Sequence, residues 1–405
     1  MSKANYSNVA TFYVGKSVFI TGGTGFVGKT LIEKLLYSCS GIDKIYVLVR
    51  DKYGKQASER LARITSTPVF DRIKKSGNEA LKKIVVISGD ITRENLGLQD
   101  DVLKTLENEA FVHVSTAFTN SDRKEINEVV YPMPINLEEA RHVADRYSHD
   151  DAIVSAFMGR KPNTYTFSKA LAEQQVMKQC EDLPAAIVRP SIVMSSIKEP
   201  CPGWIDTWNG STGLFVGMPA GVLRVVLGRG NNITDLVPVD IVTNLIVVAA
   251  TECQKSKEIK VYNCCTGTSN PITCDEASTI SRKVALKYSL SRTDCQTDYL
   301  MISNQRRRWT PAIPKQLLVH CRFFRDNGFG YLKIGKDWGT GRDWDSGNFT
   351  HTARHNAVVV SVRPWYHFGQ ANPFRPKFGS PTLIAVKINF NSVLYVIEIY
   401  IQTLG

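Results

Sequence analysis

A glycine-rich turn near the N-terminus is the feature that most restricts how this chain can fold. The run TGGTGFVG occupies residues 21–28, directly after the β-rich run Ser17–Thr21 and at the start of the helically spaced run Phe26–Tyr37. A second strand-like run, Lys44–Arg50, follows the predicted helix. A strand, a glycine turn, a helix and a second strand in this order form a βαβ unit, which is where a dinucleotide-binding turn belongs.

Each glycine of the GxxGxxG spacing has a separate predicted task. Gly22 allows the tight turn, Gly25 lets the backbone approach a pyrophosphate, and Gly28 lets the helix pack closely. The N-terminus of the helix then offers free N–H groups and the positive end of its dipole to the phosphates. We therefore predict a cofactor site formed by Thr21, Gly22, Thr24, Gly25, Phe26 and Gly28.

The following sequence, up to about residue 290, alternates apolar strand-like runs with amphipathic helical stretches. Further strands are predicted at Ile84–Ser88, Phe111–Ser115 and Ala185–Arg189. Buried strands that alternate with helices indicate a parallel sheet covered on both faces. The predicted fold class is α/β, a Rossmann-like doubly wound parallel sheet with a smaller substrate-binding part and an irregular C-terminal tail.

The pattern changes near residue 290. We predict a reductase domain over residues 10–290, with substrate-binding segments near 195–235 and 260–290, and an atypical tail of uncertain fold over 291–405. The net charge of +12 is concentrated in the tail, which holds 15 of the 50 Lys and Arg residues but 7 of the 38 Asp and Glu residues. Such an excess is compatible with a phosphorylated cofactor or substrate. Because the tail shows no known nucleic-acid-binding module, RNA binding is a weaker alternative.

Cysteine spacing and hydropathy exclude several other classes. The nine cysteines contain no CxxC pair, so neither a metal site nor a disulfide framework is expected. The apolar run Ser392–Leu404 is too short to span a membrane and contains Glu398. No signal-peptide pattern opens the chain, so we expect a soluble intracellular protein.

Residues at the ends of two predicted strands bear on cofactor choice. Arg50 stands at the end of the second strand, where a basic side chain suits a ribose 2′-phosphate and an acidic one suits a 2′-hydroxyl. This residue favours NADPH over NADH. Asp90 and Ile91, just after the third strand, are predicted to lie near an adenine ring. For Asp90, a role as a turn residue is an equally good interpretation.

A second motif, Tyr165-Thr-Phe-Ser-Lys169, opens a helical run through Val176. The i,i+4 spacing places the Tyr and Lys side chains on one face of the helix. There the ammonium group can lower the pKa of the phenol, so that Tyr165 can donate a proton to a carbonyl. Lys169 could also hold the ribose of the nicotinamide.

A third catalytic member is predicted in FVHVSTAF, residues 111–118. Ser115 and Thr116 follow an apolar strand, at the carboxyl edge where open α/β sheets bind ligands. We favour Thr116, with Ser115 as the alternative. His113, two residues before Ser115, is interpreted as a packed strand residue.

Together these segments resemble an extended short-chain dehydrogenase/reductase. The resemblance is carried by TGGTGFVG, KIYVLVR, GDIT, FVHVSTAFTN, YTFSKALAEQ and AIVRPSIV. Three further runs, at 198–217, 236–244 and 261–273, resemble those of one group within this family, the alcohol-forming fatty acyl-CoA reductases. The resemblance to these reductases covers residues 10–290. The resemblance implies two NADPH consumed per fatty acyl-CoA, reduction through the aldehyde to a primary alcohol, and catalysis by Tyr165, Lys169 and Thr116 or Ser115. It also implies attachment to a peroxisomal or endoplasmic reticulum membrane; otherwise we expect a cytoplasmic protein.

Two departures from this family are visible. Only 18 residues separate GDIT from FVHVS, where the family has a further strand and crossover helix, and its helical C-terminal domain is not recognisable after 290. Two alternatives therefore stay open. One is another extended short-chain reductase acting on a sugar nucleotide, steroid or flavonoid. The other is a catalytically inactive truncated relative that at most binds nucleotide.

Overall fold

The computed structural model describes residues 9–50, 57–98, 110–207, 211–217, 225–227, 229–287, 300–302, 359–361 and 397–403. The chain divides into two compact units, one made of residues 1–206, 237–265 and 370–405, and the other of residues 207–236 and 266–369. Each unit is described by itself. The shortened interval lies partly outside the described residues, as does most of the predicted tail.

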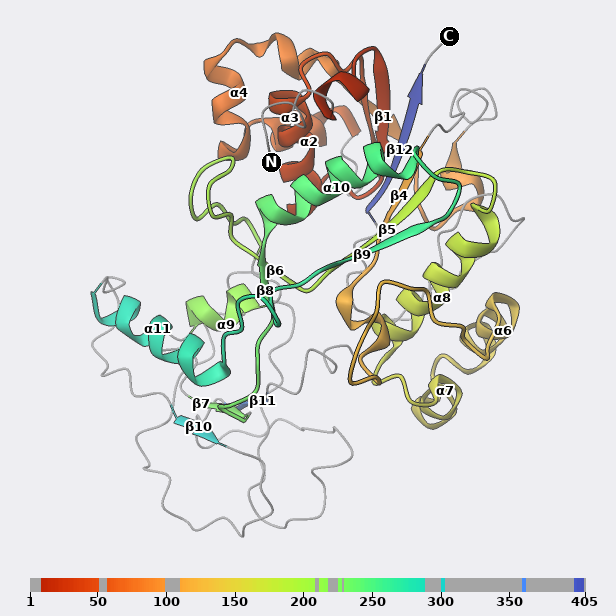
Figure 1. Ribbon diagram of the computed structural model, residues 1–405, viewed down its shortest axis with the longest axis vertical. Coiled ribbons are helices and arrows are strands. Elements are labelled where there is room, and N and C mark those ends of the chain that lie inside the picture. Colours follow the sequence, from red (N-terminus) through yellow and green to blue (C-terminus); the bar gives the residue numbers. More distant parts are fainter. Residues whose placement is uncertain are drawn as a thin grey trace. The chain divides into compact units, whose positions relative to one another are not determined.

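The first unit holds most of the regular structure (Figure 1). Its strands are β1 (Lys16–Ile20), β2 (Ile45–Val49), β3 (Ile84–Ser88), β4 (Ala110–Val114), β5 (Ala185–Pro190), β6 (Ile192–Met194), β9 (Lys260–Cys264) and β12 (Ile397–Thr403). Its α-helices are α2 (Phe26–Ser38), α3 (Ala57–Thr65), α4 (Asp71–Lys75), α6 (Leu137–Tyr147), α7 (Asp151–Met158), α8 (Thr164–Gln179) and α10 (Val239–Cys253). Short 3-10 turns are η1 (Pro68–Phe70), η2 (Asn78–Lys83), η3 (Glu94–Gly97) and η4 (Ala117–Asn120).

The expected elements up to β5 are confirmed with small shifts at their ends. The helix predicted from Phe26 to Tyr37 extends one residue further, and the helix predicted from Tyr165 to Val176 runs from Thr164 to Gln179. The Rossmann-like α/β class is also confirmed. These elements could be predicted from the spacing of apolar residues alone, because each element buries one of its faces or both.

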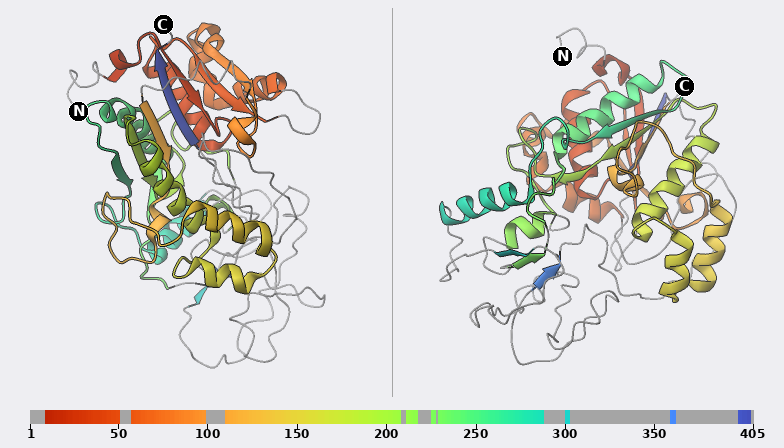
Figure 2. Two further views of the ribbon diagram at one scale, coloured as in Figure 1. Left: turned by 90° about the vertical axis from the view of Figure 1, so that its right-hand side faces the viewer. Right: turned by 60° about the horizontal axis from the view of Figure 1, so that its bottom comes forward.

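A seven-stranded sheet in the order β3-β2-β1-β12-β4-β5-β9 forms the centre of this unit. Its neighbours pair in parallel except at β12, which pairs antiparallel with β1 on one side and with β4 on the other (Figure 2). In register, Ile399 lies opposite Ile20 of β1 and Val112 of β4. The C-terminal strand thus occupies the central position between β1 and β4, and the predicted irregular tail contributes a strand to the sheet.

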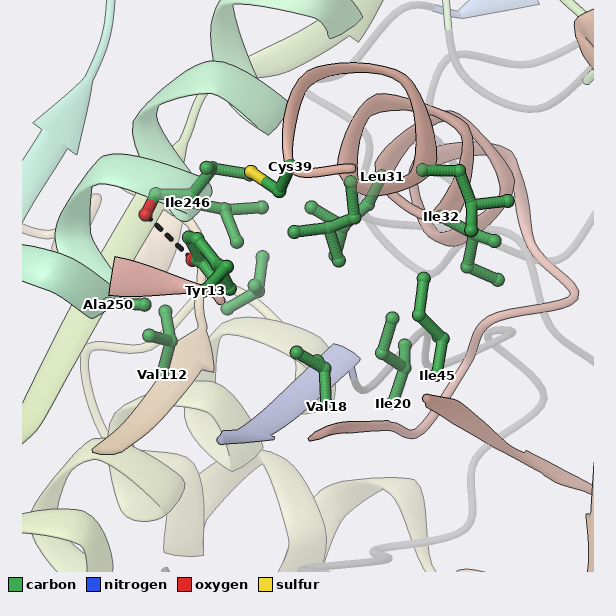
Figure 3. Packing of buried hydrophobic residues seen from close by; sticks show 14 of the residues in the cluster. Tyr13, Val18, Ile20, Leu31, Ile32, Cys39, Ile45, Val112, Ile246 and Ala250 are labelled. Atoms are coloured by element: carbon green, nitrogen blue, oxygen red, sulfur yellow. Dashed lines mark hydrogen bonds between the residues drawn. The ribbon is translucent and has the colours of Figure 1, made fainter. Parts of the chain in front are cut away.

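Helices cover both faces of the sheet. On one face, Leu31 and Ile32 of α2 and Ile246 of α10 pack over alternate residues of the strands, such as Val18 (Figure 3). The Tyr13 hydroxyl donates to the Val247 carbonyl on this side, at 2.8 Å. On the opposite face α8 contributes to a second cluster with Phe19, Leu48, Phe111 and Ile187. Because neighbouring residues of β1 and β4 point to opposite faces, each strand is buried on both.

The second unit contains α9 (Ser211–Gly217), α11 (Cys274–Lys287) and a small parallel sheet in the order β10-β7-β11. Its strands are β7 (Val225–Leu227), β10 (Leu300–Ile302) and β11 (Val359–Ser361), and β8 (Leu236–Pro238), at the boundary of the units, pairs with β6. Within the described ranges, no helix combines the length and apolarity needed to cross a bilayer. Those ranges also contain no group of three or more side chains suited to hold a metal ion.

Candidate active site

The glycine turn joins β1 to α2 as predicted. Gly22 adopts a φ of +66°, a conformation that glycine reaches without steric cost, and its carbonyl accepts the N–H of Gly25 at 3.0 Å. Gly25 is the N-cap of α2 and brings no side chain to the first helical N–H groups. The first turn of the helix also contains no acidic residue. The N-terminus of α2 is therefore suited to an anionic group such as a pyrophosphate.

Gly28 permits a close approach between α2 and the turn. A Cβ atom at this position would lie 2.4 Å from the carbonyl oxygen of Gly22 and 2.6 Å from the Cα of Gly23. Both neighbours are backbone atoms, so the turn itself would have to move. Gly23, to which we gave no role, has a related constraint, because its Cβ would lie 2.6 Å from Cγ1 of Val47 in β2. The backbone of the turn is thus packed between helix and sheet.

We expect Gly28→Ala to lower the free energy of unfolding by about 1–3 kcal/mol and to weaken dinucleotide binding. The comparison variant is Gly23→Ala, whose added methyl would meet the Val47 side chain rather than the backbone of the turn. Thermal unfolding with and without NADPH measures both effects. Equal loss of NADPH stabilisation in the two variants would contradict this account of Gly28.

Arg50 and Asp90 lie near each other after β2 and β3. The Arg50 side chain is half exposed, and its Nη1 is 4.0 Å from Oδ2 of Asp90. Asp90 Oδ1 accepts the N–H of Thr92 at 2.9 Å, which is the turn role given as the second interpretation. Ile91 is partly buried against the cluster beneath α8. Arg50 therefore presents a cation just after the carboxyl end of β2.

The helix with the Tyr–Lys motif contacts the end of β4. Asn163 is the N-cap of α8, accepting the N–H of Thr166 at 2.8 Å. Tyr165 follows in the first turn and is half-buried. Lys169 is buried, and its Nζ donates to the carbonyl of Val114 at 2.9 Å. This bond holds the Tyr165 and Lys169 face of α8 beside the strand that ends in the two hydroxyl residues.

Ser115 and Thr116 differ in how their hydroxyl groups are used. Ser115 Oγ donates to Oε1 of Glu173 at 2.5 Å, so its single proton is taken by a carboxylate. Thr116 Oγ1 makes only a long bond of 3.4 Å to the carbonyl of Pro190 and accepts the N–H of Phe118 at 3.3 Å. The Thr116 hydroxyl can therefore turn toward a ligand at a smaller cost than that of Ser115.

Glu173 and Arg189 were missed by the sequence analysis, although both lie in quoted motifs. Glu173 follows Lys169 at the same i,i+4 spacing that separates Lys169 from Tyr165. It forms an ion pair with Arg189 of β5, with its Oε2 2.6 Å from Nη2, and both side chains are fully buried. The i,i+4 spacing from Lys169 was the available signal, because it places Glu173 on the same face of the helix as Tyr165 and Lys169.

His113 is a buried strand residue, in agreement with its interpretation from sequence. Burial lowers its pKa well below the usual value, and the positive charge of Lys169 acts in the same direction. The imidazole is therefore neutral at neutral pH.

The predicted site residues gather at one edge of the sheet. Since β12 is antiparallel to both β1 and β4, those two strands run in the same direction and their carboxyl ends share an edge. The glycine turn leaves β1 at this edge, and Ser115 and Thr116 follow β4 there. A dinucleotide on the turn and a carbonyl substrate near Thr116 fit the edge at which open α/β sheets bind ligands.

Comparison with known proteins agrees with these motifs. The family model described as Male sterility protein, an NAD-binding domain, matches residues 20–110 and 104–246. Fatty acyl-CoA reductase 1 of Xenopus laevis is 38% identical over 312 residues, covering 65% of this chain and 60% of the relative. The human protein of that name is 36% identical with the same coverage, and fatty acyl-CoA reductase 2 of Bos taurus is 33% identical. The chain thus spans about 60% of the length of these relatives.

Similarity to solved structures is weaker. A reductase domain of a non-ribosomal peptide synthetase from Mycobacterium tuberculosis gives a TM-score of 0.47 at 15% identity, covering 75% of this chain and 78% of the other. The terminal reductase domain of the myxalamid pathway gives a TM-score of 0.45 at 19% identity, with coverage of 71% and 72%.

The comparisons also bear on the short interval between GDIT and FVHVS. The family model matches in two parts that meet at 104–110, inside the interval identified as short. The alignment with the Xenopus relative covers 312 positions, but 65% of this chain is about 263 residues, so about fifty positions have no counterpart. In the structure, the strand lying between β1 and β4 is β12. The family model matches more than half of the chain, and we conclude that it belongs to the Male sterility protein family of NAD-binding domains and is related to fatty acyl-CoA reductases.

Proposed function

We propose that this chain reduces long-chain fatty acyl-CoA with NADPH, through the aldehyde to a primary alcohol, and releases CoA. Family membership and the reductase relatives support this proposal. The observation that carries it is the bond from Lys169 to the Val114 carbonyl, which holds the Tyr165 face of α8 against the end of β4. The proton donor and the hydroxyl of Thr116 are thereby held at the sheet edge that also carries the glycine turn.

The residues of the turn fit a dinucleotide. The N-terminus of α2 and the backbone at Gly22 and Gly25 would hold the pyrophosphate, and Arg50 would face a ribose 2′-phosphate. NADPH, when bound, supplies the hydride. The restricted space at Gly28 supports this assignment, because a side chain there would displace the turn.

Three residues are assigned the steps other than hydride transfer. Thr116 orients the substrate carbonyl by donating to its oxygen and stabilises the oxyanion until CoA leaves. Tyr165 donates a proton to the oxygen when the aldehyde is reduced. Lys169 provides positive charge on the same helix face and fixes α8 to β4. Because the proton of Ser115 is held by Glu173, we assign the carbonyl contact to Thr116.

Arg50→Asp is expected to shift cofactor preference from NADPH toward NADH. An acidic side chain repels the 2′-phosphate and accepts a hydrogen bond from the 2′-hydroxyl. The ratio of kcat/KM for the two cofactors measures the shift, with Arg50→Lys as the variant that keeps the charge. An unchanged ratio in Arg50→Asp would contradict the assignment of Arg50 to the phosphate.

A second candidate is a relative that binds nucleotide without turnover. It is favoured by the strand between β1 and β4, which runs opposite to both neighbours. A parallel strand would end at the cofactor edge and offer its last backbone groups there, whereas β12 begins at this edge.

The two candidates are separated by incubating the full chain with NADPH and palmitoyl-CoA. Reduction predicts free CoA thiol, hexadecanol and two NADPH consumed per alcohol, all measurable in one reaction. NADPH binding without these products would contradict the proposed reduction and leave the second candidate. The expected location at a peroxisomal or endoplasmic reticulum membrane stays a prediction from the resemblance.

A further inference from the structure

Burial of the ion pair between α8 and β5 removes two charges from water, which costs free energy of folding. Glu173 and Arg189 are 1% and 0% exposed. Two bonds join them, from Nε to Oε1 at 2.9 Å and from Nη2 to Oε2 at 2.6 Å. Removing two charges from water is expensive, and apolar side chains of similar size often serve stability equally well. Stability alone is therefore a weak explanation for the pair.

The pair controls the proton of a hydroxyl at the site. Oε1 of Glu173 accepts from Ser115 Oγ, and an ionised carboxylate can only accept. Ser115 Oγ also lies 3.1 Å from Thr119 Oγ1, and that hydroxyl donates to the Thr116 carbonyl at 2.6 Å. A chain of contacts thus runs from the carboxylate through two hydroxyls to the backbone of Thr116.

Arg189 fixes the carboxylate at the start of this chain. Besides Glu173, its guanidinium donates to the carbonyls of Asn127 and Val129, at 3.1 and 2.8 Å. The backbone of Ser115 is also fixed to β5, because the N–H of Ser115 donates to the carbonyl of Val188, the residue before Arg189, at 2.7 Å. Glu173 therefore has one orientation, and Ser115 has one direction in which to donate.

We propose that Glu173 is a positioning residue that acts through Ser115 to hold the Ser115–Thr119 segment and so to aim the hydroxyl of Thr116. In this assignment, which rests on the proposed reduction, Ser115 is not a catalytic residue. Its hydroxyl is a link between the carboxylate and the segment, and Glu173 touches neither substrate nor cofactor.

A mutant cycle on Ser115→Ala, Glu173→Gln and their combination tests this role. Each single variant is expected to lower kcat by about 10- to 100-fold, as misplacement by a fraction of an ångström does, without changing KM for NADPH. Ser115→Ala removes the donor of the Ser115–Glu173 bond and Glu173→Gln replaces its charged acceptor, so both changes act on one bond and the double variant is expected to be no slower than the slower single variant. Glu181→Gln, an exposed position just after α8, is the matched control and should keep the wild-type rate.

Losses of kcat that multiply in the double variant would overturn the proposal, because Ser115 would then act on the substrate independently of Glu173. A single variant with the wild-type kcat would overturn it as well. If Glu173→Gln does not fold, the charge-free pair Glu173→Leu/Arg189→Met takes its place in the cycle.

A second readout does not depend on turnover and separates this proposal from the proposed function. In Ser115→Ala, the amides of Phe118 and Thr119 are expected to exchange hydrogen faster, because both bond to Thr116. Exchange in α10 should not change. Unchanged exchange at Phe118 and Thr119 would overturn the positioning role whether or not the chain reduces acyl-CoA.

Discussion

Deletion of residues 397–405 is expected to abolish the cooperative unfolding of the sheet. β12 pairs with five residues of β1 and five of β4, so its loss leaves each of these central strands without a partner on one side and divides the sheet. Backbone groups left buried without a partner cost about 1–3 kcal/mol each, against a total stability of about 5–15 kcal/mol. Thermal unfolding followed by circular dichroism should show a broad transition in the deleted chain and a single sharp one in the full chain.

Two single substitutions test the same strand without a deletion. Ile399→Pro removes a backbone donor in a central strand, where proline is not tolerated, and is expected to reproduce the effect. Ile399→Val keeps the donor and is the control. A truncation after Thr403 keeps all of β12 and should unfold like the full chain. Cooperative unfolding of the 397–405 deletion at the full-chain temperature would show that β12 is not part of the sheet.

Tyr165→Phe is expected to lower the rate of acyl-CoA reduction by about 10²–10⁴-fold, the usual contribution of a positioned proton donor. The variant removes one oxygen from a half-buried residue in the first turn of α8. It leaves the bond from Lys169 to Val114 and the glycine turn in place. NADPH binding is therefore expected to remain, and the loss should appear in kcat.

Thr166→Val is the matched control for loss of a hydroxyl in the same helical turn, because Thr166 Oγ1 donates only to the Asn163 carbonyl, at 3.0 Å. It is expected to change stability more than rate. A Tyr165→Phe variant that reduces palmitoyl-CoA at the wild-type rate would show that another group donates the proton.

The first half of the fold was predictable because its signals are local. The run from β1 through α2 to β2 could be located from a glycine turn and apolar spacing, and Gly28 was assigned its close approach from the motif. The same holds for the Lys169 face of α8, because i,i+4 spacing fixes which side chains share a face.

β12 could not be predicted in this way. Its sequence, IEIYIQT, alternates apolar residues with others over the first five positions, but alternation does not identify a partner. Its partners in β4 and β1 lie about 290 and 380 residues earlier in the chain, and pairing over such separations depends on which position in the sheet is open. By its sequence, the run Ser392–Leu404 indicates only that it is too short to span a membrane.

The roles of Glu173 and Arg189 also depended on the structure. Each lies in a motif that was quoted, but a lone Glu in a helix and a lone Arg in a strand have many possible partners. The fold brings them together because α8 lies across β5, so that burial leaves each charge with the other as its partner. The choice of Thr116 over Ser115 for the carbonyl contact likewise depends on the structure, which gives the acceptor of each hydroxyl proton.

The central claim is that β12 completes a nucleotide-binding sheet whose glycine turn accepts NADPH. The most direct measurement is the thermal unfolding of the full chain with increasing NADPH, and with NADH for comparison. We predict one cooperative transition that rises with NADPH, by an amount equivalent to about 2.7 kcal/mol at a concentration of 100 times Kd, and rises less with NADH. A transition that does not move with NADPH would contradict the claim.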